Sequence, residues 1–168
     1  MSRSLRGAVL ALVPVVAFAV SADAQPLVQK NMSVAMAMKV IEGVNAACGQ
    51  PGPLFTMSVA VVDRAGLPIM QVSGDTASPH NWELVFRKAY TARTYRRNSI
   101  EWRDTTAGDS DTQGQRALGQ VIPLGGGVPI FAGDEIIGAV GVSGGEGGQE
   151  GDTACAEAGV AAIADQLQ

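Results

Sequence analysis

The sequence predicts one small α/β domain of the α+β type, in which helices pack against a mostly antiparallel sheet. Two observations predict this class. Segments with helical apolar spacing alternate with pairs of short, β-rich runs joined by tight turns, in the order helix, hairpin, helix, hairpin, helix. Hydrophobic residues also make up 46% of the 168 positions, which is enough for one genuine core.

The first 24 residues have the features of a secretory leader and are set aside from the fold. Arg3 and Arg6 give a positive start, an almost continuous apolar run follows, and Ala-Asp-Ala at positions 22–24 is a small-x-small cleavage pattern. We therefore expect cleavage before Gln25, export to the periplasm or the medium, and a mature domain of residues 25–168. A retained N-terminal anchor is the alternative, although the apolar run is shorter than the roughly 20 residues of a membrane span.

The charge of the chain limits its possible partners. The formal net charge is −4, and loss of the leader makes the remainder more acidic because Arg3 and Arg6 outnumber Asp23 there. This sign argues against nucleic acid or an anionic membrane surface as a partner. After the leader, the sequence contains no segment apolar enough to predict a membrane span.

The first element of the mature chain is predicted as a helix over residues 34–47. Met38 and Ile41, with neighbouring alanines, keep one side apolar at helical spacing. Ser33 is a suitable N-cap because its hydroxyl can accept a backbone N–H of the first turn, and Gly49 ends the helix.

Residues 55–62 and 67–72 form the first predicted hairpin. Both runs favour strands, and the residues between them, Asp-Arg-Ala-Gly at 63–66, are typical of a tight turn. Asp63 is interpreted as a turn residue whose carboxylate binds backbone N–H groups ahead of it. Pro68 indicates that the second strand starts late or lies at an edge of the sheet, because proline has no N–H to donate.

A central helix is predicted over residues 82–95. Its apolar positions follow the three-and-four spacing of an amphipathic helix, and they are Trp82, Val85, Phe86, Ala89 and Ala92. The stretch 98–120 is polar and rich in Asp, Thr and Gly, so we expect a flexible surface excursion between Thr105 and Gln115.

The last third of the chain predicts a short strand at residues 121–124, a second hairpin and a terminal helix. The hairpin joins residues 128–131 and 135–142 through a tight turn. A glycine-rich acidic loop then leads to a helix over residues 152–167, with Asp152 as its N-cap. Small residues dominate this helix, which allows close approach to a sheet or to another helix.

The chain has two cysteines, Cys48 and Cys155. Export places them in an oxidising compartment, where such a pair usually forms a disulfide. The alternative is two unpaired buried thiols. The sequence C-x-x-C-H, to which c-type haem is attached, is absent, which excludes covalent attachment of a haem through thioether bonds.

Three segments of the mature chain carry a family resemblance. They are residues 58–66 (SVAVVDRAG), residues 87–92 (RKAYTA), and residues 126–130 (GGVPI) followed by 138–145 (GAVGVSGG). In this order and separation they resemble the GlcG/HbpS family of haem-binding proteins, also called haem-degrading domains. The resemblance covers nearly the whole mature domain. It implies a profilin-like fold with a five-stranded antiparallel sheet, frequent assembly into homo-oligomers, and binding of haem or a related tetrapyrrole.

His80 is the only histidine of the chain, and it lies in the loop before the central helix. Imidazole is the commonest protein ligand of haem iron, so with the resemblance we predict His80 as the axial ligand. A surface histidine or a helix cap is the alternative interpretation.

The central helix supplies the remaining candidate binding residues. Trp82 and Phe86 offer apolar contact for a haem ring, while Arg87 and Lys88 offer cations for its propionates. Tyr90 is a further candidate because tyrosinate ligates ferric iron in some haem proteins. The same region also carries Tyr95, Arg93, Arg96 and Arg97. An ordinary solvated helix face would show the same basic residues.

The sequence gives only weak evidence for known enzyme motifs. Residues 141–145 (GVSGG) satisfy G-x-S-x-G, but several residues separate Ser143 from the next predicted helix, and the only histidine precedes the serine. The glycine-rich segments lack the Lys-Ser/Thr of a phosphate-binding loop.

The function expected from the sequence is an exported, non-covalent haem-binding module that sequesters, senses or carries haem. A cofactor-free, homo-oligomeric accessory subunit is one alternative, with the small-residue helix and the glycine-rich segments serving subunit contacts. An enzyme that degrades haem or turns over a small metabolite is the other.

Overall fold

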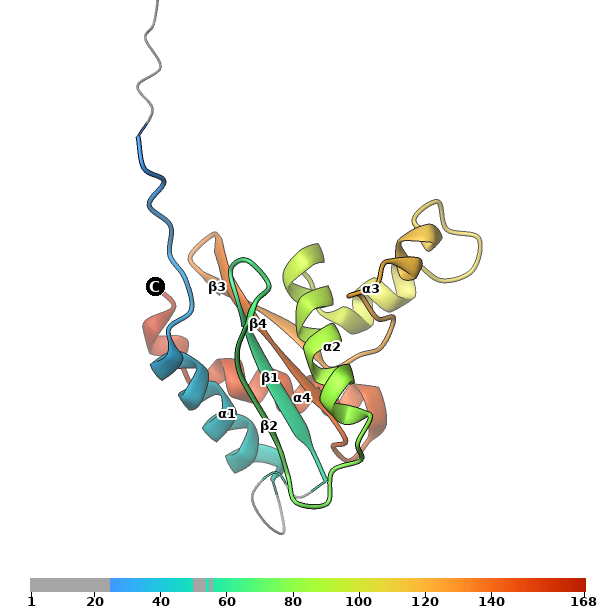
Figure 1. Ribbon diagram of the computed structural model, residues 1–168, viewed down its shortest axis with the longest axis horizontal. Coiled ribbons are helices and arrows are strands. Elements are labelled where there is room, and N and C mark those ends of the chain that lie inside the picture. The colour runs from blue at the N-terminus through green and yellow to red at the C-terminus, as the bar shows by residue number, and fades with distance from the viewer. Residues whose placement is uncertain (1–24, 50–53, 55) are drawn as a thin grey trace, which may run out of the picture.

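The computed structural model describes residues 25–49, 54 and 56–168 (Figure 1). The predicted leader, residues 1–24, lies outside the described residues. Among these residues the elements follow the predicted order of helix, hairpin, helix, hairpin, helix. A short α-helix and a 3-10 helix are added after the central helix, and a second 3-10 helix, η2 (Ala164–Gln166), follows the last one.

An antiparallel sheet of four strands forms the centre of the described domain, in the order β2-β1-β4-β3. The strands are β1 (Ser58–Asp63), β2 (Pro68–Ser73), β3 (Gly127–Ala132) and β4 (Glu135–Ser143). Both predicted hairpins are confirmed, and β1 and β4 join them, with Val61 opposite Val140. Pro68 begins the edge strand β2, as its missing N–H predicts. Asp63 accepts the N–H groups of Ala65 and Leu67 in the first turn, at 2.8 and 2.9 Å.

The expected fifth strand at residues 121–124 is not part of the described sheet. Side chains of helix α2 (Asn81–Tyr95) take its backbone polar groups instead of a neighbouring strand. Thr91 Oγ1 accepts the N–H of Ile122 at 2.9 Å, and Arg87 Nη2 donates to the carbonyl of Val121 at 2.7 Å. The segment therefore runs along the helix, and the sheet of the described domain has four strands rather than five.

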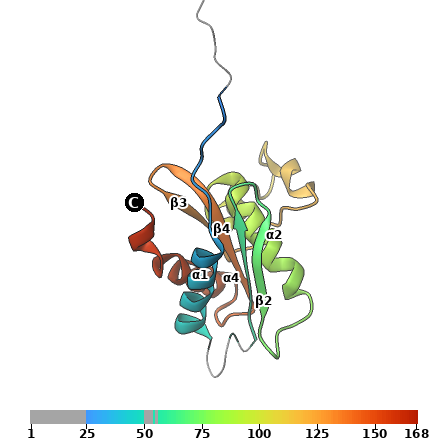
Figure 2. The same ribbon diagram turned by 60° about the vertical axis from the view of Figure 1, so that its left-hand side comes forward.

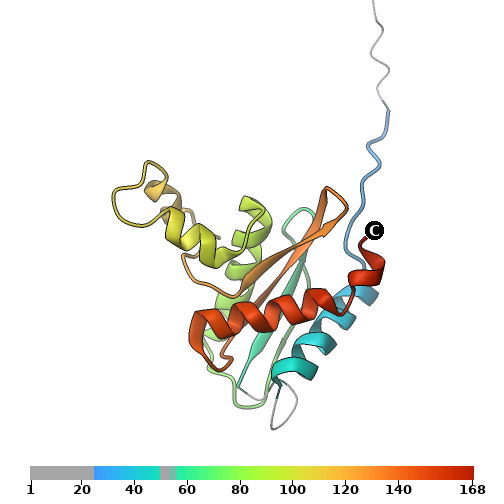
Figure 3. The same ribbon diagram turned by 180° about the vertical axis from the view of Figure 1, so that it is seen from behind.

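The helices form one layer on each face of the sheet. Helix α2 covers one face, and α1 (Val34–Cys48) with α4 (Gly148–Ala161) covers the other (Figures 1, 2 and 3). Strand β1 contributes side chains to the cores on both faces of the sheet, because successive side chains of a strand point to opposite faces. Val59 and Val61 join the core beneath α1 and α4, whereas Val62 joins a smaller cluster beneath α2.

Helices α1 and α4 cross closely, and small residues make this possible. A Cβ atom on Gly159 would lie 2.8 Å from the carbonyl oxygen of Val40 and 2.6 Å from the Val44 side chain. The predicted disulfide is present: Cys48 at the end of α1 is bonded to Cys155 in α4, with their Cα atoms 6.0 Å apart. The small residues of the terminal helix thus serve packing inside the domain.

The helix ends agree with the sequence at α1 and differ at α4. Ser33 Oγ accepts the N–H of Met36 at 3.2 Å, which confirms it as the N-cap. The prediction of Asp152 as the cap of the last helix is wrong, because α4 already begins at Gly148 after Gly147 in a left-handed conformation (φ 83°). Asp152 lies one turn inside the helix and is buried.

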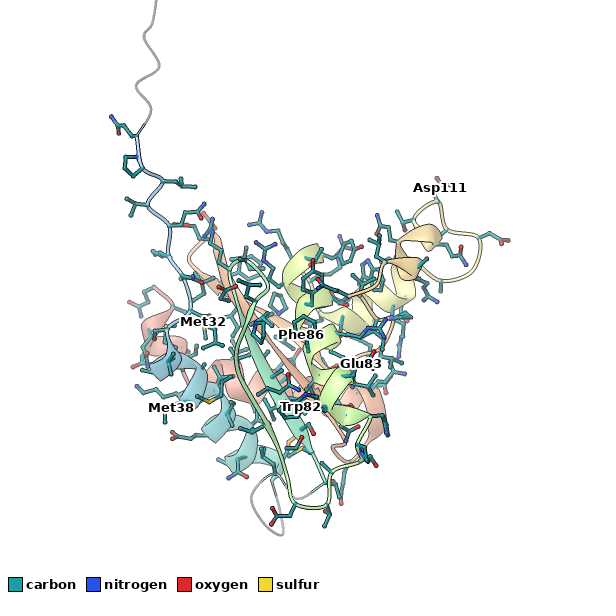
Figure 4. The ribbon with its side chains drawn as sticks, viewed as in Figure 1. Met32, Met38, Trp82, Glu83, Phe86 and Asp111 are labelled. Atoms are coloured by element: carbon teal, nitrogen blue, oxygen red, sulfur yellow. A yellow bond between two sulfur atoms is a disulfide. The ribbon has the colours of Figure 1, made fainter. Side chains whose placement is uncertain are left out.

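The polar stretch after α2 is more ordered than its composition indicates. It contains α3 (Ser99–Thr105) and a short 3-10 helix, η1 (Gln113–Ala117), and projects from the body with Asp111 at its tip (Figures 1 and 4). Trp102 anchors it, because this side chain is buried and stacks on Tyr95 with ring centroids 4.7 Å apart. Arg116 ties the outer part back by donating to Thr106 Oγ1 at 3.0 Å.

Over the described residues, the helices are all too short or too polar to cross a membrane.

Candidate functional site

One side of helix α2 carries a row of aromatic residues, of which Phe86 and Tyr90 are half-buried. Trp82, Phe86 and Tyr90 recur every four residues and therefore lie along one side of the helix (Figure 4 labels the first two). The ring centroids of Phe86 and Tyr90 are 5.9 Å apart, and Trp82 is 55% exposed. We call these three residues the aromatic side of α2. The row therefore consists of one exposed indole followed by two half-buried rings, which together offer apolar and aromatic contact along the helix.

An apolar hollow of about 240 Å³ adjoins Tyr90. Tyr90 and Thr94 form one wall, and the segment 118–121 forms the other. Arg87 holds that segment in place through its bond to Val121, so the same side chain that displaces the fifth strand also shapes the hollow.

A second, more polar hollow of about 430 Å³ lies beside the turn between β1 and β2. Its lining comes from the N-terminal arm, the turn and α2, and consists of Gln29, Asn31, Arg64, Ala65 and Arg93. The turn approaches α2 here because Gly66 has no side chain: a Cβ at this position would lie 3.0 Å from the ring of Tyr90. Tyr90 packs against the same turn that borders the polar hollow.

His80 is exposed and immediately precedes α2 with a helix-like backbone (φ −68°, ψ −21°). Its side chain does not cap the helix. At about 100° per residue, His80 projects from the axis about 160° away from Trp82. It also lies about 15 Å along the axis from Tyr90, at 1.5 Å per residue. The structure therefore does not bring His80 to the aromatic side of α2.

Lys88 is only 2% exposed, and its ammonium group forms its hydrogen bonds inside the domain. Its Nζ donates to Asp152 Oδ2 at 2.8 Å and to the carbonyl of Val142 at 3.0 Å. Burial lowers the pKa of Lys88 below its usual value, against the opposing effect of the Asp152 carboxylate. This lysine, which the sequence proposed for a propionate, lies in an ion pair that joins α2 to α4.

Arg87 is likewise bound within the domain. Its Nη1 pairs with Glu83 at 2.9 Å on the next turn, and its Nη2 is the group that holds Val121. The buried Nε of Arg87 has no hydrogen-bond partner among the described residues, and the same is true of the Nε of Arg93 on α2. Arg93, on α2, and Arg64, on the neighbouring turn, line the polar hollow beside the aromatic side.

Sequence reasoning missed the part of the site that comes from outside α2. Arg64, Asn31 and the segment 118–121 reach the helix only through the fold, and no local motif marks them. Arg93 is among the basic residues that the sequence offers for the propionates, and it follows Tyr90 by three residues, so it lies on the same side of the helix.

Neither a hydrolase nor a multi-ligand metal centre is formed by the described residues. Ser143 of the G-x-S-x-G sequence is buried at the end of β4, where its hydroxyl donates to Asn81 Oδ1 at 3.2 Å. Within the same residues, no group of three or more His, Cys, Asp or Glu side chains could hold a metal ion.

The fold and the site define a small α+β domain that presents an aromatic helix side between an apolar and a basic hollow. A family model described as haem degrading protein HbpS-like matches residues 13–161. The chain belongs to this HbpS-like family.

Individual relatives agree with this assignment. An uncharacterized 15.0 kDa protein from the dhaT-dhaS intergenic region of Citrobacter freundii is 30% identical over 117 residues, which are 68% of this chain and 81% of that protein. The crystal structure of a double mutant of Streptomyces reticuli HbpS has a TM-score of 0.74 and 27% identity, covering 88% of this chain and 97% of that one. A crystal structure of a PduOC haem complex has a TM-score of 0.72 and 24% identity, with coverages of 80% and 96%.

Proposed function

We propose that the chain is an exported module that binds haem non-covalently on the aromatic side of α2 and sequesters, carries or senses it. The observation that carries this proposal is the row of Trp82, Phe86 and Tyr90 along one helix side, which is exposed at Trp82 and half-buried at the other two rings, with Arg93 at its end. The family description and the haem complex of PduOC support the choice of haem as the ligand.

The residues present fit such a group. From Trp82 to Tyr90 the aromatic side is about 12 Å long at 1.5 Å per residue, which suits one edge of a tetrapyrrole. The apolar hollow beside Tyr90 gives additional contact, and the free guanidinium donors lie at the far end of the row. When bound, haem supplies an iron centre for ligand binding and electron transfer, while the helix supplies apolar contact and charge.

Two side chains are candidates for the iron ligand, and they lie apart on the helix. Tyr90 lies on the aromatic side, where its phenolic oxygen can ligate ferric iron, whereas His80 projects to a different side of the helix. We therefore propose Tyr90 as the ligand of a haem on the aromatic side, and we treat His80 as the competing assignment.

A haemin titration of the mature chain, residues 25–168, tests the proposal. Wild-type protein is expected to give a saturable Soret shift, and the haem is expected to dissociate on denaturation because no covalent attachment exists. Tyr90→Phe should change the position of the Soret and charge-transfer bands, and His80→Ala should leave them unchanged. If haemin gives no saturable shift, the cofactor-free accessory subunit becomes the better account. If only His80→Ala changes the bands, the ligand is His80.

The same complex distinguishes carriage from degradation. We propose carriage, sequestration or sensing, because the described site offers haem contacts but no further reactive constellation. With ascorbate in aerated buffer, the Soret band of the complex should then persist as it does in a redox-inert haem protein. Steady loss of the band, with release of iron, would assign haem degradation instead.

Export is proposed from the leader, and the disulfide between Cys48 and Cys155 supports it, since such bonds persist in oxidising compartments. The intact mass of the protein recovered from a bacterial periplasm should correspond to a chain that starts at Gln25 and carries one disulfide. A full-length mass in the membrane fraction would indicate a retained anchor. Native mass spectrometry of the same sample tests the proposed homo-oligomer.

A further inference from the structure

Two arginines and two amide side chains make up most of the lining of the polar hollow beside the turn between β1 and β2. Arg93 comes from α2, Arg64 and Ala65 come from the turn, and Gln29 and Asn31 come from the N-terminal arm. Carboxylate side chains of the described residues do not contribute to this lining, although the chain as a whole has net charge −4.

Arg93 is the least satisfied cation of the hollow. Its Nε atom is buried and has no hydrogen-bond partner, and within the described residues its guanidinium forms no ion pair. A buried donor of a charged group that lacks an acceptor costs free energy. Because Arg93 lines the hollow, an anion entering it would meet a guanidinium that has no carboxylate partner among the described residues.

Arg64 is held in place while part of its guanidinium stays unused. Its Nη1 donates to Glu135 Oε2 at 2.9 Å and to the carbonyl of Ile136 at 3.2 Å. The contacts among the described residues leave Nε and Nη2 of this side chain unused. The pair with Glu135 compensates the charge of both groups, so Arg64 contributes hydrogen-bond donors to the hollow, and the uncompensated positive charge comes from Arg93.

Asn31 is oriented by two bonds on one side of its amide. Its Oδ1 accepts the backbone N–H groups of Met32 and Arg64, both at 2.9 Å. Since the oxygen is used twice, the NH₂ end of Asn31 remains as a further donor at the hollow. These bonds also fix the N-terminal arm against the turn and so complete one wall.

We propose that this hollow binds a carboxylate group, with Arg93 as the principal partner and Arg64 and Asn31 as supporting donors. Planar guanidinium groups match the two oxygens of a carboxylate, and such charge-assisted bonds are stronger than neutral ones. The carboxylate has two possible sources: a propionate of a haem on the aromatic side of α2, or a free small carboxylic acid. The first source rests on the proposed function, whereas the second does not.

Three ligands and two variants test the proposal. The ligands are haemin, haemin dimethyl ester, whose propionates are uncharged, and citrate, each titrated by absorbance or calorimetry. The test variant is Arg93→Ala, with Arg93→Gln as a second variant that keeps the length of the side chain. Arg97→Ala is the matched control, because Arg97 is an exposed arginine that does not line the hollow. Thermal unfolding confirms that each variant is folded.

If the source is a propionate, Arg93→Ala and Arg93→Gln should weaken haemin binding about tenfold or more, as expected for loss of a charged hydrogen-bond pair. Arg97→Ala should change it less than about threefold, and the dimethyl ester should bind wild type and Arg93→Ala equally. If the source is a free acid, citrate should bind the wild type and lose its binding in both Arg93 variants.

The outcomes separate this proposal from the proposed function. Binding of citrate that requires Arg93, in a protein that does not bind haemin, would remove the haem function and keep the carboxylate site. Haemin binding that is equal in the Arg93 variants and the Arg97→Ala control, with no Arg93-dependent binding of citrate, would overturn the carboxylate site and keep the haem function.

Discussion

The ion pair between Lys88 and Asp152 joins the two helix layers of the domain past the end of the sheet. Lys88 reaches across because Gly126, at the start of β3, has no side chain: a Cβ there would lie 3.1 Å from Lys88 Nζ and 2.9 Å from Asp152 Cβ. Gly126 also has a φ of 113°, which other residues rarely adopt. The second carboxylate oxygen of Asp152 accepts the N–H of Gly145 at 2.8 Å, so the buried charge is paired and hydrogen-bonded.

Replacing Lys88 by methionine should destabilise the domain strongly. The variant removes the cation and leaves the Asp152 carboxylate buried, which in comparable cases costs about 3–5 kcal/mol. Urea denaturation of wild type and Lys88→Met measures the difference. Lys39→Met is the control, because Lys39 is exposed on α1 and its change should stay within about 0.5 kcal/mol. Equal effects of the two substitutions would contradict the role assigned to Lys88.

The same pair gives a pH dependence with a definite sign. Burial lowers the pKa of Lys88 in the folded chain, whereas in the unfolded chain it returns to 10.5. Between these two values the unfolded chain binds the additional proton, so rising pH favours the folded state with respect to this group. The difference in unfolding free energy between wild type and Lys88→Met should therefore widen as pH approaches 10.5. Tyr95, whose pKa burial raises, titrates in both proteins and cancels in the comparison. If the difference in unfolding free energy between the two proteins narrows as the pH rises, the pKa of Lys88 is not lowered in the folded chain.

Sequence reasoning places Lys88 among the surface cations of α2, although its position carries a signal. Val85, Ala89 and Ala92 form the buried side of the helix, and Lys88 falls at the same three-and-four spacing. A charged residue at a core position indicates a buried partner, but that partner, Asp152, is 64 residues away and resembles a helix cap in the sequence. Long-range pairing of this kind is not contained in local patterns. His80 is likewise a candidate iron ligand in the sequence only because it is the single histidine. The geometry of helix α2 places it away from the aromatic side.

At the scale of elements, the crossing of α1 and α4 depends on glycine at positions where helices usually favour alanine. Gly43 and Gly159 let the helix backbones approach, and the disulfide fixes the same contact. The small-residue character of the terminal helix predicts its use in close approach. The sequence does not show which neighbour it approaches, and in the structure that neighbour is α1.

Gly159→Ala should destabilise the domain, although alanine normally stabilises a helix relative to glycine. In an exposed helix interior this change stabilises by about 1 kcal/mol, but here the new Cβ would press on Val40 and Val44 and is expected to cost about 1–3 kcal/mol. Thermal unfolding measures the sign directly. Gly114→Ala in η1 is the control, because a Cβ at Gly114 meets no atom within 4 Å. A stabilised Gly159→Ala protein would show that the helices are not in close contact.

The hairpins and the three long helices are predictable because each has a clear period and a clear turn or cap. The fifth strand is a wrong prediction for a physical reason: residues 121–124 are apolar and β-favouring, but Thr91 and Arg87 satisfy their backbone groups. Helix α3 escapes prediction because its one core residue of any size, Trp102, gives no periodic pattern within a polar stretch. Local sequence shows which segments prefer extended or helical backbone, but not which groups will be their partners.

For the whole molecule, the disulfide spans 107 residues and links the first helix to the last. A bond that closes a loop of this length contributes about 4–5 kcal/mol in the chain-entropy model. Reduction with dithiothreitol should therefore lower the unfolding free energy by an amount of this order, as measured by urea denaturation. A Cys48→Ser/Cys155→Ser protein should start at the lower stability and show no response to the reductant. A wild-type protein whose stability is unchanged on complete reduction would contradict this contribution.

The domain as a whole separates its binding features from its stabilising ones. The disulfide and the crossing of α1 and α4 lie on one face of the sheet, and α2, which carries the aromatic side, covers the other face (Figures 1 and 3 show the helices). Ligand contacts on α2 can therefore be changed without touching the α1–α4 contact. This separation makes the exposed residues of α2 suitable for testing the function by substitution.

The most direct test of the central claim is the haemin affinity of Trp82→Ala, measured by Soret titration beside wild type and Met38→Ala. Met38 is 48% exposed on α1, on the opposite face, and is a matched loss of exposed apolar surface. Trp82→Ala should weaken haemin binding about tenfold, as expected for loss of a large aromatic contact, while Met38→Ala should bind haemin like the wild type. Equal affinities in all three proteins would show that haem does not lie on the aromatic side of α2.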